Sequence, residues 1–234
     1  MNKSLYFSDS YLKEFDSTVV AMEGTNVILD QTAFYATGGG QPNDTGKLIC
    51  NGKDYAVTDV KKSDQGTVHV IAEPGLKIGD RVHGVIDWER RYRFMRMHTA
   101  AHVLSATVNK FTGALVTGKQ LDLQQSKIDF SLEQFDKDKI QQYGEEASKT
   151  CASGAQVKTY FLPREDALKI PGMVRLAERM PPNVPELRVV EIIGIDTQAC
   201  GGTHVNDIKE IGTIKVLKAE NKGKTNRRMY YTLV

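Results

Sequence analysis

The N-terminal part of the chain alternates between apolar and polar residues in short runs, as half-buried β-strands do. Turn signals rich in glycine and aspartate separate these runs. We expect strands over residues 26–30, 46–50, 55–60, 67–73 and 81–88. Because short strands at regular spacing are typical of small barrels and sandwiches, this part of the chain is predicted to be one of the two.

The pattern changes after Trp88, where apolar residues from Phe94 to Phe111 recur every three or four positions. That spacing predicts an amphipathic helix over 91–112, and Gly113 is well placed to end it. Further on we expect a helix over 134–153, strands over 156–162 and 187–196, a helical turn over 164–170, a proline-rich loop over 180–186 and a terminal hairpin over 212–234. The change of period predicts two domains, 1–90 and 91–234.

Composition narrows the class of protein. The apolar fraction of 40% and the charged fraction of 26% are ordinary for a soluble globular protein. No apolar run is long enough to span a membrane, and the N-terminus lacks the apolar core of a signal peptide, so we expect a cytoplasmic location. The three cysteines, Cys50, Cys151 and Cys200, are too widely spread to suggest a disulfide framework.

Basic residues gather in two places, near the start of the expected first helix and near the C-terminus. Clustered basic side chains can neutralise phosphates and so mark a possible nucleic-acid surface. A solvated helix start and a charged hairpin tip would give the same pattern. The candidates for contact with nucleic-acid phosphates are Arg91, Arg93, Arg96, Lys222, Lys224, Arg227 and Arg228.

Two short motifs carry the chemistry of metal ligands. In HTAAH, His98 and His102 lie one helical turn apart, so both imidazoles project from the same side of a helix. In CGGTH, Cys200 and His204 lie four residues apart, and the two glycines and the threonine between them suit a short loop. Together these residues supply three imidazole nitrogens and one thiolate, a donor set that suits tetrahedral Zn²⁺.

The residues alone do not decide whether this metal site is structural or catalytic. The two motifs lie too far apart in sequence for a zinc-finger module, and either a closed structural zinc or a functional cleft would fit. The other two histidines, His69 and His83, lie in alternating strands and are expected to be structural or surface residues.

The motifs also resemble a known family. HTAAH followed by CGGTH is similar to the zinc motifs of the editing domain of alanyl-tRNA synthetase. AFYATGGGQPNDTGKL resembles the glycine-rich segment before that domain, and ENKGKTNRRMYY resembles its final basic strand. These matches come in the family's order and cover nearly the whole chain. We expect no aminoacylation domain before residue 1, so the chain resembles the free-standing editing proteins of the AlaX type, in their medium-length subclass.

The resemblance implies an α+β fold, with a translation-factor-like β-barrel followed by an editing domain of helices and antiparallel sheet. It implies zinc-dependent hydrolysis of seryl-tRNA made in error on tRNA(Ala), with glycyl-tRNA(Ala) as a second candidate substrate. Mischarged tRNA(Ala) would be the partner, without a nucleotide cofactor. A zinc-stabilised RNA-binding module without catalysis and a threonyl-tRNA-type editing domain are the alternatives. Whether zinc activates water or positions the substrate stays open.

The resemblance also implies residue roles. Thr117, in the loop after the first helix, falls where the family places a polar selector of serine and is the candidate catalytic residue. Gln120 follows closely, although Gly118 stands where the synthetases carry a glutamine. The glycine-rich segment would lie over the pocket, although a long β-turn explains it equally well. The candidate substrate-binding residues are Gly39, Gly40, Gln41, Asp44, Thr117 and Gln120.

Overall fold

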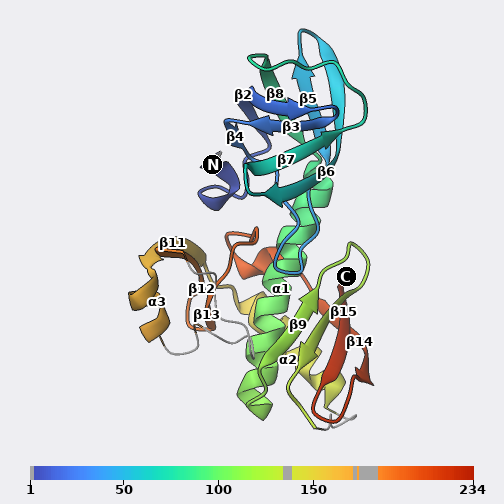
Figure 1. Cartoon of the computed structure of the whole chain (residues 1–234). Helices are drawn as coiled ribbons and strands as arrows, with labels where there is room; N and C mark the ends of the chain where they lie inside the picture. Colours follow the sequence, from blue (N-terminus) through green and yellow to red (C-terminus); the bar gives the residue numbers. More distant parts are fainter. Residues whose placement is uncertain (1–2, 134–138, 171–172, 174–183) are drawn as a thin grey trace. The chain divides into compact units, whose positions relative to one another are not determined.

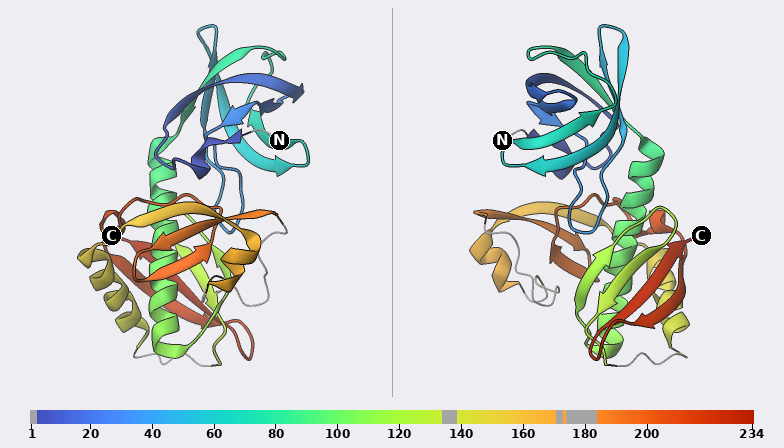
Figure 2. Two further views of the ribbon diagram at one scale, coloured as in Figure 1. Left: turned by 90° about the vertical axis from the view of Figure 1, so that its left-hand side faces the viewer. Right: turned by 45° about the vertical axis from the view of Figure 1, so that its right-hand side comes forward.

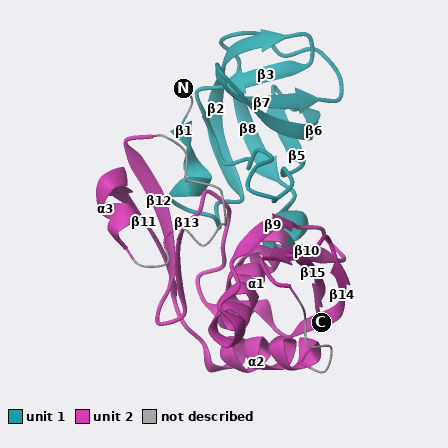
Figure 3. Ribbon diagram, turned by 60° about the horizontal axis from the view of Figure 1, so that its bottom comes forward, with its two compact units in different colours: residues 1–93 teal, residues 94–234 magenta. Residues whose placement is uncertain are grey.

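The computed structural model describes residues 3–133, 139–170, 173 and 184–234. Its contacts divide the chain into two compact units, Met1–Arg93 and Phe94–Val234 (Figure 3). The described residues form a closed antiparallel barrel, two further antiparallel sheets and three α-helices. This architecture confirms the predicted α+β class. In the described part of the chain, no helix is both long and apolar enough to cross a membrane.

Six antiparallel strands close the barrel of the first unit (Figure 1). Around the barrel they are β2 (Glu14–Glu23), β3 (Asn26–Leu29), β7 (Gly66–Ile71), β6 (Lys53–Ser63), β5 (Gly46–Cys50) and β8 (Arg81–Ile86). All but β2 coincide with strands expected from the alternating pattern. Two short strands, β1 (Lys3–Ser4) and β4 (Gln31–Thr32), pair in parallel, and the 3₁₀ turn η1 (Leu5–Phe7) follows β1.

Strand β2 is not predicted from the alternation of apolar and polar residues, because the polar residue Ser17 occupies one of its inward positions. Phe15, Ser17 and Val19 are buried in alternation with more exposed neighbours, which is the period of a strand. The Ser17 hydroxyl is hydrogen-bonded to the carboxylate of Asp30. A buried polar group is tolerated when it has such a partner, so the serine does not interrupt the strand.

His69 lies buried in the first unit and is neutral, which agrees with the structural role expected for it. Its Nδ1 lies 3.2 Å from the carbonyl oxygen of Val27, which can only accept, so Nδ1 carries the proton. Its Nε2 then accepts from the Thr32 hydroxyl at 2.7 Å. Burial lowers the pKa of His69 to about 4. His83 is partly exposed on the barrel surface, as expected for a surface residue.

The glycine-rich segment forms a tight hairpin turn. The backbone N–H groups of Gly38 and Gln41 each donate to the other residue's carbonyl, at 3.1 and 2.9 Å. The two residues between them, Gly39 and Gly40, have φ values of 57° and 84°. Two successive positive φ angles define the turn type that glycine favours in two-residue hairpins. Gln41 is fully buried, so only the glycines of this turn face solvent.

Arg91 and Asp44 form a buried ion pair, and this corrects the roles expected for both. Both side chains have 0% solvent exposure. The Arg91 Nε donates to the two carboxylate oxygens of Asp44 at 3.0 Å, and its terminal nitrogens donate to the carbonyls of Ser10 and Ala33. A guanidinium enclosed in this way does not reach a tRNA phosphate, and its carboxylate partner is not available to a substrate. The pair instead ties the start of helix α1 (Trp88–Thr112) to the glycine-rich segment.

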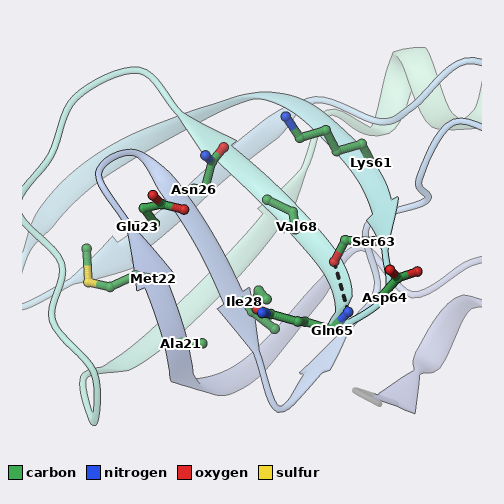
Figure 4. Close-up of a pocket in the computed structure, with 10 residues that line it drawn as sticks. All are labelled: Ala21, Met22, Glu23, Asn26, Ile28, Lys61, Ser63, Asp64, Gln65 and Val68. Carbon is green, nitrogen blue, oxygen red and sulfur yellow. Dashed lines mark hydrogen bonds between the residues drawn. The ribbon is translucent and has the colours of Figure 1, made fainter.

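A shallow hollow lies on the outside of the barrel, between the hairpins that join β2 to β3 and β6 to β7 (Figure 4). Its lining mixes apolar side chains such as Met22, Ile28 and Val68 with polar ones such as Asn26 and Gln65. The lining contains no histidine or cysteine, and no residue that the sequence singles out for function belongs to it.

The second unit contains most of α1 and two antiparallel sheets (Figure 2). The four-stranded sheet has the order β14 (Ile214–Asn221), β15 (Arg227–Leu233), β10 (Ser126–Phe130) and β9 (Val116–Gln120). The three-stranded sheet has the order β11 (Val157–Pro163), β12 (Glu186–Ile192) and β13 (Asp196–Ala199). Helix α2 (Ile140–Ser153) packs on β14, α3 (Arg164–Lys169) packs on β11 and β12, and the 3₁₀ turn η2 (Ile208–Ile211) packs on α2.

Two expectations for this unit are corrected. The segment after α1, expected to be a loop, contains β9 and β10, so Thr117 lies in a strand. The strand expected over 187–196 ends at Ile192, because a turn with Gly194 at φ 74° reverses the chain into β13. The terminal hairpin and the strand before α3 are confirmed. Residues 134–138 of the expected second helix and 180–183 of the proline-rich loop lie outside the described residues.

The buried ion pair leads to a test of stability. Removing one partner leaves the other charge buried and unpaired, so Arg91→Met and Asp44→Asn should each lower the free energy of unfolding by about 3–5 kcal/mol. The double variant Arg91→Met/Asp44→Asn should lose less than the sum of the two. Urea unfolding followed by the fluorescence of Trp88, the single tryptophan, measures the three losses. Additive losses would show that the two side chains act independently.

Candidate metal centre

Four side chains of the second unit bring their donor atoms together in the way the two motifs predict. His98 and His102 project from one side of α1, and Cys200 and His204 lie in the segment after β13. Their ligand atoms all lie within 4.8 Å of one another. The Cys200 Sγ is 3.6 Å from the His98 Nε2 and 3.4 Å from the His204 Nε2. The three imidazoles are buried, and Cys200 is partly exposed.

The segment that carries Cys200 is held in place by a buried arginine. Arg188, on β12, donates from Nη1 to the carbonyl oxygens of Cys200 and Gly202, at 2.8 and 2.9 Å. The Cys200 backbone N–H returns a hydrogen bond to the Arg188 carbonyl at 3.0 Å. These hydrogen bonds to Arg188 therefore hold the CGGTH segment in a fixed position.

Hydrogen bonds behind two of the rings fix which nitrogen faces the cluster. His102 Nδ1 lies 2.8 Å from Asp196 Oδ2, a carboxylate that also accepts from the Gln198 side-chain amide at 2.9 Å. His204 Nδ1 lies 3.1 Å from the hydroxyl of Thr99, which donates its own proton to the Met95 carbonyl at 2.9 Å. Both Nδ1 atoms are therefore protonated donors, which leaves each Nε2 lone pair directed at the cluster.

The pKa shifts of three of the four donors favour the form that binds a metal. Burial, helped by the nearby Lys119, keeps the pKa of His98 well below its ordinary value, and burial lowers that of His204 to about 4. Burial alone would raise the pKa of the Cys200 thiol, but the neighbouring His98, Lys119 and His204 lower it well below the ordinary value. Burial also opposes protonation of His102, yet the hydrogen bond to Asp196 raises its pKa and makes it a more basic ligand.

These residues fit a zinc ion. Three neutral imidazoles and one thiolate form a set of four donors that Zn²⁺ accepts in tetrahedral geometry. The His102 Nε2 is a buried polar atom without a hydrogen-bond partner among the described residues. Because an orphaned buried nitrogen is costly, its orientation into the cluster is explained best by a bond to a metal.

Comparison with known proteins places the chain in a family. Models for "tRNA synthetases class II (A)" and for the "Threonyl and Alanyl tRNA synthetase second additional domain" match residues 7–90 and 187–230. The alanyl-tRNA editing protein AlaX-M of Saccharolobus solfataricus is 49% identical over 100% of this chain and 99% of its own length. The chain belongs to the AlaX-M family of alanyl-tRNA editing proteins. The resemblance found in the sequence motifs is thereby confirmed.

More distant relatives of this AlaX-M family member agree. The AlaX-M protein of Methanosarcina barkeri is 46% identical over 100% of both chains. The alanine–tRNA ligase of Thermoplasma acidophilum is 38% identical over 93% of this chain, which corresponds to 25% of the ligase. The similarity to the ligase therefore concerns a part of that longer enzyme.

Several residues around the donor cluster carry no signal in the sequence pattern. Lys119, on β9, places its Nζ 2.6 Å from the His98 Nε2. Asp196, Thr99 and Arg188 support the ligands from elements that lie apart in sequence. A carboxylate, a hydroxyl or a cation in such a position has no fixed spacing from the ligand it supports, so only the fold reveals it.

Thr117 lies on the same strand as Lys119, at an irregularity of the sheet. Gly118 pairs with Asp129 and Val116 pairs with Phe130, which leaves Thr117 as the extra residue of a β-bulge. Its hydroxyl donates to the Asn226 side-chain oxygen at 2.8 Å. β-Bulges turn a side chain away from its regular direction and are frequent beside active sites. Gln120, the other candidate on this strand, is exposed.

The basic residues expected to contact tRNA fall into two groups. Arg227 is buried and donates to carbonyls of its own hairpin turn, whereas Arg228 is paired with Asp129 on the neighbouring strand β10. The expectation of a tRNA contact is thereby corrected for Arg227. Lys222 and Lys224 are exposed at that turn. On α1, Arg93 and Arg96 are partly exposed, and Arg96 donates to the Ile211 carbonyl at 2.7 Å.

The hydrogen bond behind His102 predicts the strength of metal binding. In Asp196→Asn the side chain no longer carries the charge that orients the ring and raises its basicity, so zinc affinity should fall about 10- to 100-fold. Competition with a chromophoric chelator measures this affinity. Asp64→Asn, which removes an exposed carboxylate of the barrel, is the matched control and should leave zinc affinity unchanged. Equal affinities for both variants would remove Asp196 from the metal site.

Proposed function

We propose that this chain is a trans-editing hydrolase that removes serine from mischarged seryl-tRNA(Ala), with zinc at the four-donor cluster. The observation that carries the proposal is the convergence of the His98, His102, Cys200 and His204 donor atoms, in a chain whose full-length relatives are named alanyl-tRNA editing proteins. Glycyl-tRNA(Ala) is the second candidate substrate. The reaction is hydrolysis of the ester between the amino acid and the terminal ribose.

Selectivity explains why a second site is needed for such an error. A pocket shaped for a small amino acid cannot strongly reject one that adds a hydroxyl or lacks a methyl group. A separate site that hydrolyses the wrong ester supplies the missing discrimination. That site has to hydrogen-bond the serine hydroxyl, because alanine would leave the same protein group unpaired.

The residues of the chain divide the work as follows. His98, His102, Cys200 and His204 would hold zinc, which when bound supplies Lewis-acid chemistry towards an oxygen atom. Asp196 and Thr99 keep two of the imidazoles directed at that place. Because Cys200 is the partly exposed member of the set, its side is where an ester can approach.

Thr117 is the residue we assign to recognition of serine. Its hydroxyl donates to Asn226, so the oxygen keeps lone pairs that can accept a hydrogen bond from the serine side chain. Because Thr117 is the extra residue of the bulge in β9, its side chain does not have to follow the regular alternation of the strand. Lys119, two positions further on, reaches His98, which brings this strand to the metal ligands.

For the tRNA we propose contacts with two exposed and two partly exposed basic residues. Lys222 and Lys224 at the β14–β15 turn, together with Arg93 and Arg96 on α1, are the remaining candidates for phosphate contacts. The glycine turn at Gly39 and Gly40 offers backbone that a ligand can approach closely, because glycine carries no side chain.

The function is tested by release of the amino acid. Purified zinc-loaded protein should release serine rapidly from seryl-tRNA(Ala) and spare alanyl-tRNA(Ala), because only serine offers the hydroxyl that the site recognises. Seryl-tRNA(Thr) serves as the control for tRNA identity. A zinc-loaded protein that binds tRNA and releases no serine would instead be an RNA-binding module. Preference for seryl-tRNA(Thr) would indicate a threonyl-type editing site.

The selector role of Thr117 leads to a separate prediction. Thr117→Val keeps the shape of the side chain and removes the hydroxyl, so kcat/KM for seryl-tRNA(Ala) should fall about 5- to 150-fold, corresponding to a loss of about 1–3 kcal/mol. Thr117→Ser should keep most of the activity. Thr58→Val, at an exposed strand position of the barrel, is the matched control. Wild-type rates in Thr117→Val would exclude the hydroxyl from substrate recognition.

A further inference from the structure

Lys119 occupies an unusual place for a lysine. It lies on β9 opposite Ile128, whose side chain is fully buried, so it belongs to the inner face of the four-stranded sheet. From there its Nζ reaches to 2.6 Å from the His98 Nε2, the same nitrogen that lies 3.6 Å from the Cys200 Sγ. The amino group therefore lies at the edge of the donor cluster and not in bulk solvent.

A cation in this position works against metal binding. A protonated lysine has three N–H donors and no lone pair, so it cannot serve as a ligand, and it repels a divalent cation at short range. With the His98 Nε2 lone pair engaged by an ion, the amino group needs another acceptor next to the cluster. A structural zinc site has no use for such a group, whereas a site that develops negative charge on a bound substrate does.

We propose that Lys119 is a catalytic residue that donates a hydrogen bond to the ester carbonyl oxygen as this oxygen gains negative charge. The inference rests on the function proposed above, namely hydrolysis of an aminoacyl-tRNA ester. It adds to that function a residue that the sequence motifs do not mark.

The step balances without a further reactant. The oxygen of water bonds to the carbonyl carbon, and the carbonyl electron pair moves onto its oxygen, beside the Lys119 ammonium. The electron pair then returns as the bond from carbon to the ribose oxygen breaks, and that oxygen takes up a proton that derives from the water. Lys119 keeps its protons throughout, because it stabilises charge and transfers no proton.

Two substitutions and one matched control test the assignment. Lys119→Met keeps the length of the side chain and removes its charge, whereas Lys119→Arg keeps the charge. Lys127→Met makes the same change on β10, where Lys127 pairs with Gln120 on the opposite face of the sheet. Circular dichroism and thermal unfolding establish that each variant is folded.

The first measurement is zinc affinity, by chelator competition, which does not depend on catalysis. Lys119→Met should bind zinc several-fold more tightly than the wild type, because a neighbouring cation is gone, whereas Lys127→Met should match the wild type. Unchanged or weaker zinc binding in Lys119→Met would show that the amino group does not face the ion or that it supports the ligands, and would overturn the proposal.

The second measurement is single-turnover hydrolysis of seryl-tRNA(Ala) at saturating zinc. Lys119→Met should lose about 100- to 1,000-fold in kcat with little change in KM, since the contact strengthens in the transition state. Lys119→Arg should recover part of this loss, and Lys127→Met should be unaffected. Full activity of Lys119→Met beside an active wild type would overturn the role of Lys119 alone. A wild-type protein without esterase activity would overturn the proposed function and this role with it.

Discussion

The hydrogen bonds behind the imidazole rings are the interactions on which the site depends. His102 and His204 are buried, and a buried ring nitrogen without a partner is expensive. Asp196 and Thr99 occupy the two Nδ1 atoms, which leaves each Nε2 to face the other donors. The direction of these two imidazoles is thus set by residues outside the four-donor cluster, as in metal sites where outer partners fix tautomer and ring orientation.

One hairpin of the second unit supplies one of those partners and holds the loop that carries Cys200. The turn around Gly194 folds β13 back on β12, so that Asp196 begins a strand and Cys200 follows its end. Arg188, on β12, then fastens the loop by its carbonyl oxygens. One hairpin therefore provides a ligand, the support of another ligand and the clamp that holds the loop, which couples the geometry of the site to a single sheet.

Local patterns were sufficient to predict the four residues of the donor cluster, because each pair is close in sequence. Helical period alone places His98 and His102 on one side of α1. The supports lie far from these ligands along the chain, and no local spacing marks Asp196 or Lys119. Arg91 shows the opposite case, since it belongs to a basic cluster in sequence while the helix turns its side chain inward to Asp44. The barrel was predictable from alternation, except for β2, where Ser17 occupies an inward position.

Two features of the second unit distinguish a site that handles a substrate from a structural staple. A purely structural metal site needs only ligands and the residues that orient them, and it gains nothing from a lysine whose amino group lies 2.6 Å from the nitrogen of His98. It gains nothing either from the bulge at Thr117, which interrupts the ladder between β9 and β10. A cation beside the donors opposes metal binding and a bulge interrupts sheet pairing, and both features lie on β9, the strand that brings Lys119 to the cluster. Their presence on the same strand is therefore a physical reason to favour hydrolysis over a purely structural role.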